Sequence, residues 1–139
     1  MPPRQVWLFQ LGCWVACATA AVHLAGHVFV PGTAGPPELA GPAPAYLFLI
    51  PGQDVPSARQ VADGFSLALA LLLATLGAAG LAVLSRGHAD ATLMRGIARV
   101  YALGIGVILA LSILSFFSLQ TFFLAVAALC FGLAAVSEE

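Results

Sequence analysis

Four long apolar stretches constrain this chain more than any other feature of its sequence. They cover about residues 6–30, 58–84, 94–117 and 120–136. At a helical rise of about 1.5 Å per residue, roughly 20 apolar residues cross the hydrocarbon layer of a bilayer, which is about 30 Å thick. Backbone polar groups in that layer must be paired within the chain, so each stretch is expected to fold as a helix. The sequence therefore predicts an all-α, polytopic membrane protein with four transmembrane helices in one domain, 1–139.

The composition supports this prediction and excludes several classes of protein. Hydrophobic residues make up 61% of the 139 residues and charged residues 8%, whereas about 25% of the residues in soluble domains are charged. The formal net charge is −1, and the few charges lie between apolar stretches, so no basic face exists to bind nucleic acid. All five basic residues are arginine, which, with abundant alanine, glycine and proline, indicates a bacterial source.

Prolines dominate the segment between the first two stretches, about residues 31–57. Each proline removes a backbone donor and restricts the residue before it, so a continuous helix is excluded there. We therefore expect a long, Pro-rich external loop between helices one and two. Helix two should begin directly after Ser57, because Ser57 and Gln60 have the spacing of a capping box.

Small residues recur four apart on several of the predicted helices, as at Gly12 and Ala16, at Ala70, Ala74 and Ala78, and at Ala102, Gly106 and Ala110. Such faces let helix backbones approach closely in lipid, where van der Waals packing drives association. The short turn near Ser118 makes helices three and four an antiparallel hairpin. An antiparallel four-helix bundle is expected. Membrane lipids are its expected partners, and the small-residue faces are also compatible with a homo-oligomer or a larger membrane complex.

The arginines predict the orientation of the chain. Arg86, Arg95 and Arg99 surround the loop between helices two and three, Arg4 precedes helix one, and Arg59 alone falls on the opposite side. The positive-inside rule then places both termini in the cytoplasm, with the protein in the plasma (inner) membrane.

The first 21 residues also resemble a secretory signal peptide, with one arginine and an alanine-rich end. Cleavage there is the alternative to a retained helix one. Because the apolar stretch continues to residue 30, beyond any suitable cleavage site, we expect helix one to be retained.

Two histidines and one aspartate are the candidate metal ligands. His23 and His27 are four residues apart, which on a helix places them on one face about 6 Å apart, a spacing that can chelate one divalent metal ion. Asp63 lies at a similar depth on helix two and would complete a two-histidine, one-carboxylate site. The alternatives are a proton-handling site and a buried His–Asp hydrogen bond that joins two helices. At 100° per residue, Cys13 and Cys17 fall within roughly 120° of both histidines, a stripe expected to face the interior.

Most enzyme templates are absent from the sequence. It contains no phosphate-binding loop, dinucleotide fingerprint, nucleophile elbow or zinc-protease motif. Histidines four apart on one helix cannot take opposite axial positions on one haem iron. The three cysteines lie within apolar stretches and imply no disulfide framework.

The stretch 21–27, the proline-containing loop, and the stretch 63–67 leading into a leucine-rich helix together resemble a functionally uncharacterised family of small bacterial four-helix integral membrane proteins. The resemblance covers nearly the whole chain and implies the four-helix architecture. It also implies that His23, Asp63, Phe65 and Ser66 form one recurring arrangement. It supplies no reaction.

Two classes of function remain from the sequence. The first is a non-catalytic membrane protein, either an accessory subunit or a binder of lipid or another apolar ligand. The alternative is a small membrane enzyme or redox module with a metal or quinone-type site at His23, His27 and Asp63. A transporter would require oligomerisation, because so few intramembrane charges provide little material for an aqueous path.

Overall fold

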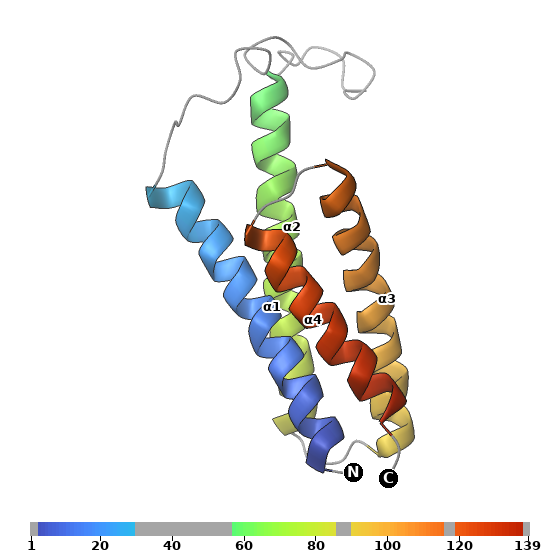
Figure 1. Ribbon diagram of the computed structural model, residues 1–139. Coiled ribbons are helices and arrows are strands. Elements are labelled where there is room, and N and C mark those ends of the chain that lie inside the picture. The colour runs from blue at the N-terminus through green and yellow to red at the C-terminus, as the bar shows by residue number, and fades with distance from the viewer. Residues whose placement is uncertain (1–2, 30–56, 86–89, 116–118, 138–139) are drawn as a thin grey trace, which may run out of the picture.

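A computed structural model describes residues 3–29, 57–85, 90–115 and 119–137, and these residues form four helices (Figure 1). They are α1 (Pro3–Phe29), α2 (Ala58–Ser85), α3 (Ala91–Ser115) and α4 (Leu119–Val136). Apart from Ser57, the predicted Pro-rich loop lies outside the described residues. The all-helical class expected from the apolar stretches is confirmed.

The start of α2 has the hydrogen bonds that the capping box predicts. The backbone N–H of Ser57 donates to Oε1 of Gln60 at 2.8 Å, and the backbone N–H of Gln60 donates to Oγ of Ser57 at 3.2 Å. These bonds satisfy backbone donors that have no partner inside the first turn.

Helix α3 begins at Ala91, earlier than the residue 94 expected from the apolar stretch. Asp90 caps it, because its Oδ1 accepts a hydrogen bond from the backbone N–H of Leu93 at 2.6 Å. The cap and the first turn of α3 contain polar residues, so the start of the apolar stretch lies later than the start of the helix. The residue type of Asp90 is itself a helix-start signal.

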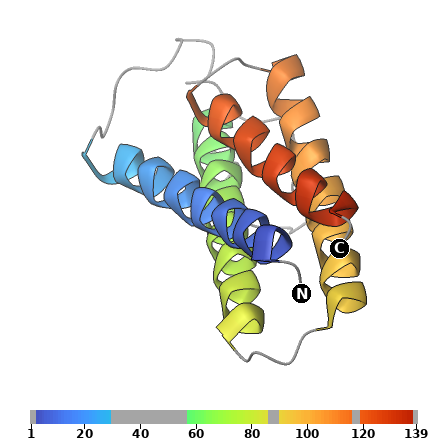
Figure 2. The same ribbon diagram turned by 60° about the horizontal axis from the view of Figure 1, so that its bottom comes forward.

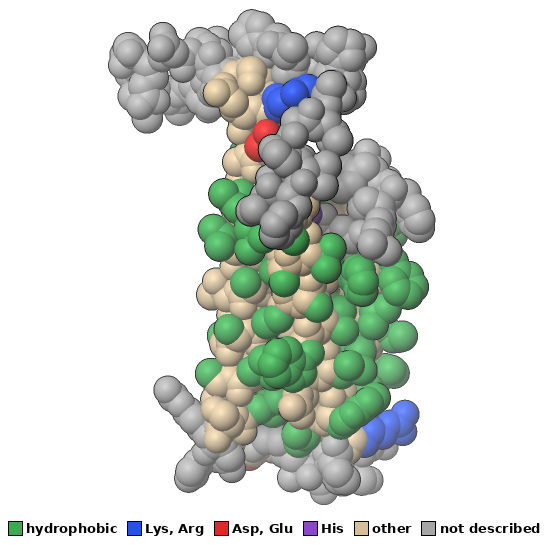
Figure 3. Space-filling view, turned by 90° about the vertical axis from the view of Figure 1, so that its left-hand side faces the viewer, with side chains coloured by type: hydrophobic (Ala, Val, Ile, Leu, Met, Phe, Trp, Pro, Cys, Tyr) green, Lys and Arg blue, Asp and Glu red, His purple; other side chains and the backbone are tan. Residues whose placement is uncertain are grey.

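Three helices are long and apolar enough to cross a membrane, namely α1, α2 and α3. Helix α4 has 18 residues, which gives about 27 Å of helix, slightly less than a typical hydrocarbon layer. Figure 3 shows hydrophobic side chains over the middle of one face, with charged side chains near its two ends. Large apolar side chains are exposed on every helix, among them Trp7, Trp14, Leu72, Val100, Leu103, Phe122 and Leu129. A helix facing water would carry polar residues there, so these exposed faces suit contact with lipid.

Helix α1 packs against both α2 and α4, and α4 packs against α3 (Figures 1 and 2). Within the described residues, no interface of similar extent joins α2 to α3. The start of α1 meets the end of α4, where Nε2 of Gln5 donates to the backbone carbonyl of Ala134 at 3.3 Å. The packing order is therefore α2, α1, α4, α3.

Glycines determine how closely α1 approaches α2. A Cβ added at Gly77 would lie 2.5 Å from Sγ of Cys17 and 2.8 Å from the carbonyl oxygen of Cys13, and one at Gly80 would collide with Sγ of Cys13. The sequence predicts a small-residue face at Ala70, Ala74 and Ala78, and the first two of these residues are buried and half-buried. Ala78 is exposed, and the close contact with α1 continues at Gly77 and Gly80 instead.

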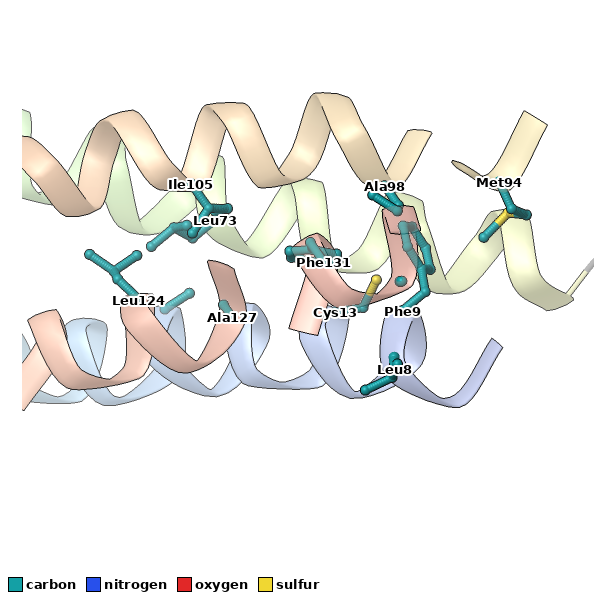
Figure 4. Close-up of a cluster of buried hydrophobic side chains, with 13 residues drawn as sticks. Leu8, Phe9, Cys13, Leu73, Met94, Ala98, Ile105, Leu124, Ala127 and Phe131 are labelled. Carbon is teal, nitrogen blue, oxygen red and sulfur yellow. The ribbon is translucent and has the colours of Figure 1, made fainter. Parts of the chain in front are cut away.

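An aromatic cluster joins α1, α3 and α4. The ring centroid of Phe9 lies 5.6 Å from that of Tyr101 and 5.4 Å from that of Phe131, and the Tyr101 and Phe131 centroids are 5.1 Å apart. The hydroxyl of Tyr101 donates to the backbone carbonyl of Leu76 in α2 at 3.0 Å. Figure 4 shows Phe9 and Phe131 among the buried side chains between the helices. Tyr101 thus contacts the core and links it to α2.

The glycine contacts predict a strong asymmetry between two alanine substitutions. Gly77→Ala should destabilise the protein by about 1–3 kcal/mol, because the new methyl group meets backbone that cannot move away. Gly104→Ala is the control, since a Cβ at Gly104 meets nothing within 4 Å and alanine favours the helix by up to about 1 kcal/mol. Thermal unfolding in mild detergent, followed by circular dichroism, measures both. Equal melting temperatures for the two variants would contradict the packing described here.

Candidate functional site

Polar side chains line the contact between α1 and α2. Nε2 of His23 shares a hydrogen bond with Oγ of Ser66, and both side chains are half-buried. Closer to the centre of the helices, Sγ of Cys17 lies 4.0 Å from the carbonyl oxygen of Ala74, and buried Cys13 packs against α2. We call Cys13, Cys17, His23 and Ser66 the polar seam. Cys13, Cys17 and His23, the three described members of the stripe expected to face the interior, all contact α2.

The contacts along the polar seam define the register of α1 against α2. Cys17 meets Ala74 and His23 meets Ser66, so residue numbers fall along α2 as they rise along α1. One further turn of α1 reaches His27, and one turn back along α2 reaches Asp63. These two helix positions therefore lie at a similar level, toward the end of the helices where α2 begins.

Only part of the predicted metal site lies within the described side chains. Asp63 is exposed and His23 contacts Ser66, while the side chain of His27 lies outside the described part. No three histidine, cysteine or acidic side chains cluster around a metal-sized space among those described. A divalent metal held by His23, His27 and Asp63 stays a prediction. The register of α1 against α2 is compatible with it.

The four residues singled out by the family resemblance do not all meet. His23 and Ser66 are in contact, but the Phe65 side chain is 71% exposed and faces outward from α2. Such a phenylalanine would contact lipid rather than a polar site. An apolar residue suits either face of a membrane helix, so the outward position of Phe65 could not be predicted from its residue type.

The His23–Ser66 pair has limited catalytic capacity. An imidazole can activate a hydroxyl as a nucleophile, but acyl transfer also requires a group that orients the imidazole and donors for the oxyanion. Ser66 lies within α2, where backbone N–H groups are already bonded along the helix. The pair is better suited to joining helices or to hydrogen bonding with a ligand.

Sequence reasoning missed a second site, an open groove of about 660 Å³ beside the first turns of α3. It is lined by Asp90, Thr92, Leu93, Gly96, Ile97, Val100 and Tyr101. We call it the α3 groove. It lies on the side of α3 from which Tyr101 reaches the Leu76 carbonyl in α2. The exposed Leu93 and Val100 do not reveal the groove in the sequence, because the same apolar residue types occur on lipid-facing surfaces that have no groove.

Two buried polar atoms have no hydrogen-bond partner among the described residues, namely Oε1 of Gln5 and Nε of Arg95. The Gln5 side chain is only 1% exposed, and its Nε2 is bonded to α4. A buried acceptor without a partner costs free energy, and a buried water molecule is the usual way to satisfy it.

No protein-family model, curated protein or solved structure matches this chain.

A double-mutant cycle tests whether the His23–Ser66 contact stabilises the fold. His23→Ala and Ser66→Ala should each lower the free energy of unfolding, and the double variant should lose about 1 kcal/mol less than their sum, because the shared bond can be lost only once. Thermal unfolding in detergent supplies the values. The control is Thr75→Ala, whose hydroxyl is exposed and donates to its own helix at Leu71. Strict additivity of His23→Ala and Ser66→Ala would argue against a coupled pair.

Proposed function

We propose that this chain is an integral protein of the plasma membrane that binds a lipid or another apolar molecule in the α3 groove, alone or as the accessory subunit of a larger complex. In this proposal its helices form an antiparallel transmembrane bundle with both termini in the cytoplasm. The α3 groove is the observation that carries the proposal.

The size and chemistry of the groove favour such a ligand. Its volume of about 660 Å³ falls within the range of about 300–1,000 Å³ that is common for small-molecule sites. Its polar residues, Asp90 and Thr92, lie at the start of α3, and the apolar Leu93, Ile97 and Val100 follow. A molecule with a polar end and an apolar body matches this order.

The described charges are compatible with the proposed orientation. Arg4 lies in the first turn of α1, and Arg95 and Arg99 lie in the first half of α3, while Arg59 lies at the start of α2. Figure 1 places the starts of α1 and α3 at one end of the molecule and the start of α2 at the other. More arginines at the α1 and α3 end favour the cytoplasm on that side. The bilayer can thin locally around the shorter α4 at modest cost.

Filling the groove should remove the ligand. Val100→Trp places a large ring in the groove and should abolish most of the lipid that co-purifies with the protein in mild detergent, measured by native mass spectrometry. Val107→Trp is a matched control on the same helix, because Val107 is 61% exposed against 67% for Val100 and does not line the groove. Equal lipid retention by both variants would refute the groove as the binding site.

The second candidate is a small membrane enzyme or redox module with a divalent metal or a quinone-like molecule at His23, His27 and Asp63. The hydrogen bond between His23 and Ser66 favours it, because a ligating histidine is usually oriented by a partner on its other ring nitrogen. The shared level of His27 and Asp63 in the helix register favours it as well.

Metal analysis and an ultraviolet–visible spectrum of protein from its native membrane test this candidate. We expect stoichiometric metal or a chromophore in the wild type, and its loss in His23→Ala and in His27→Ala with helicity retained. His88→Ala serves as the control, since His88 is far from this position in the sequence. Metal-free, colourless wild-type protein would exclude this candidate and leave the histidines a structural role.

A further inference from the structure

The side of α1 that faces away from α2 and α4 carries a polar side chain between two tryptophans. Trp7 and Trp14 are 59% and 56% exposed, and Gln10 between them is exposed as well. Gln5, five residues earlier, is buried and donates to Ala134 in α4, so the two glutamines of α1 lie on opposite sides of the helix. Among the described residues, none hydrogen-bonds to the Gln10 amide.

The depth of Gln10 makes an unpaired amide unfavourable. The apolar span of α1 runs from Arg4 to Gly26, so its middle is Val15 and Gln10 lies five residues away, about 7–8 Å along the helix axis. With this span centred on the bilayer, hydrocarbon extends about 15 Å to each side of the middle. The glutamine side chain is too short to bring its amide out to the headgroups from there. An amide without a partner in hydrocarbon costs free energy.

A hydroxyl in a comparable position is satisfied within its own helix. Thr75 is exposed near the middle of α2 and donates to the backbone carbonyl of Leu71 at 2.8 Å. The Gln10 amide makes no such bond, so its partner must come from outside the described residues. An amide has both donors and acceptors, and a second amide at the same depth satisfies both.

The exposed residues of α1 have the spacing of a paired helix. Trp7, Gln10, Trp14 and Ala21 follow one another at intervals of three, four and seven residues, and all four are exposed. We call them the outer face of α1. Alternation of three and four residues keeps side chains on the contact line of a left-handed helix pair. A single polar residue on that line specifies the register and the number of helices.

We propose that this chain forms a parallel, two-fold symmetric homodimer through the outer face of α1. Two copies inserted in the same direction place their Gln10 amides at the same depth. Each amide donates to the other, as a self-complementary two-fold interface requires. Trp7 and Trp14 supply large packing surfaces on both sides of the amides.

This inference goes beyond the proposed function and uses only one part of it. It rests on the transmembrane placement of α1. It does not depend on a ligand in the α3 groove, because the residues that line the groove belong to α3 and its cap. The dimer and the lipid site can therefore be tested separately.

Energy transfer between donor-labelled and acceptor-labelled copies of the full chain in phosphatidylcholine liposomes measures the dimer. We expect transfer in the wild type that falls as the protein is diluted with lipid. Gln10→Leu should raise the dissociation constant at least about tenfold, because two hydrogen bonds between the helices are lost. Gln10→Asn keeps a shorter amide and should retain part of the affinity.

A second pair of variants locates the interface on α1. Trp14→Ala should also weaken the dimer, because it removes a large ring from the outer face. Leu103→Ala is the control, since Leu103 is 72% exposed on α3, which has no extensive interface with α1 in the described part of the chain. Circular dichroism checks that each variant remains helical.

The outcomes separate this inference from the proposed function. Absence of transfer in the wild type at every protein-to-lipid ratio would overturn the dimer, and this comparison needs no variant. A Gln10→Leu dimer as tight as that of the wild type would overturn it too, as would equal losses in Trp14→Ala and Leu103→Ala. Extraction of the wild type from membranes by alkaline carbonate would instead contradict the transmembrane placement on which the proposed function depends.

Discussion

The hydroxyl of Tyr101 makes a polar connection between two helices that otherwise have no extensive interface in the described part of the chain. Its ring packs against Phe9 and Phe131, while its hydroxyl donates to the Leu76 carbonyl, so one side chain contacts all the other helices. Hydrogen bonds between membrane helices contribute only about 0.6 kcal/mol on average. The position of α2 relative to α3 therefore depends mainly on how α2 is held by α1, and how α1 is held by α4.

The contact between α1 and α2 relies on close approach rather than on exclusion of water. Lipid tails are as apolar as leucine, so burying a large apolar side chain between membrane helices gains little, and packing of small residues matters more. Gly77 and Gly80 bring the α2 backbone against Cys13 and Cys17. This tight contact fixes the register that brings His23 to Ser66. The geometry of the polar seam thus depends on Gly77 and Gly80, which have no side chain.

The sequence predicted the helices well because long apolar stretches have one stable fold in a membrane, and because Ser57 and Gln60 mark the start of α2. It predicted poorly which face of each helix packs against the other helices. In a soluble helix the polar side reveals the outer face, but here both faces are apolar, so Gly77, Gly80 and the core position of Tyr101 were not identified. The same ambiguity hid the α3 groove. For the polar seam, the common face of Cys13, Cys17 and His23 could be predicted because polarisable side chains are rare in α1. Ser66 could not be predicted as the partner of His23, because that pairing depends on the register of α1 against α2.

The position of the α3 groove has a consequence for how a ligand would reach it. The residues that line the groove follow α3 lengthwise from Asp90 to Tyr101, so in a bilayer a ligand would reach them from the side of the helix. A molecule that reached the groove in this way would arrive by lateral diffusion within the bilayer. Its occupancy would then follow its mole fraction among the surrounding lipids, so that the composition of the membrane, and not a concentration in the cytoplasm, would set the fraction of protein in the bound state.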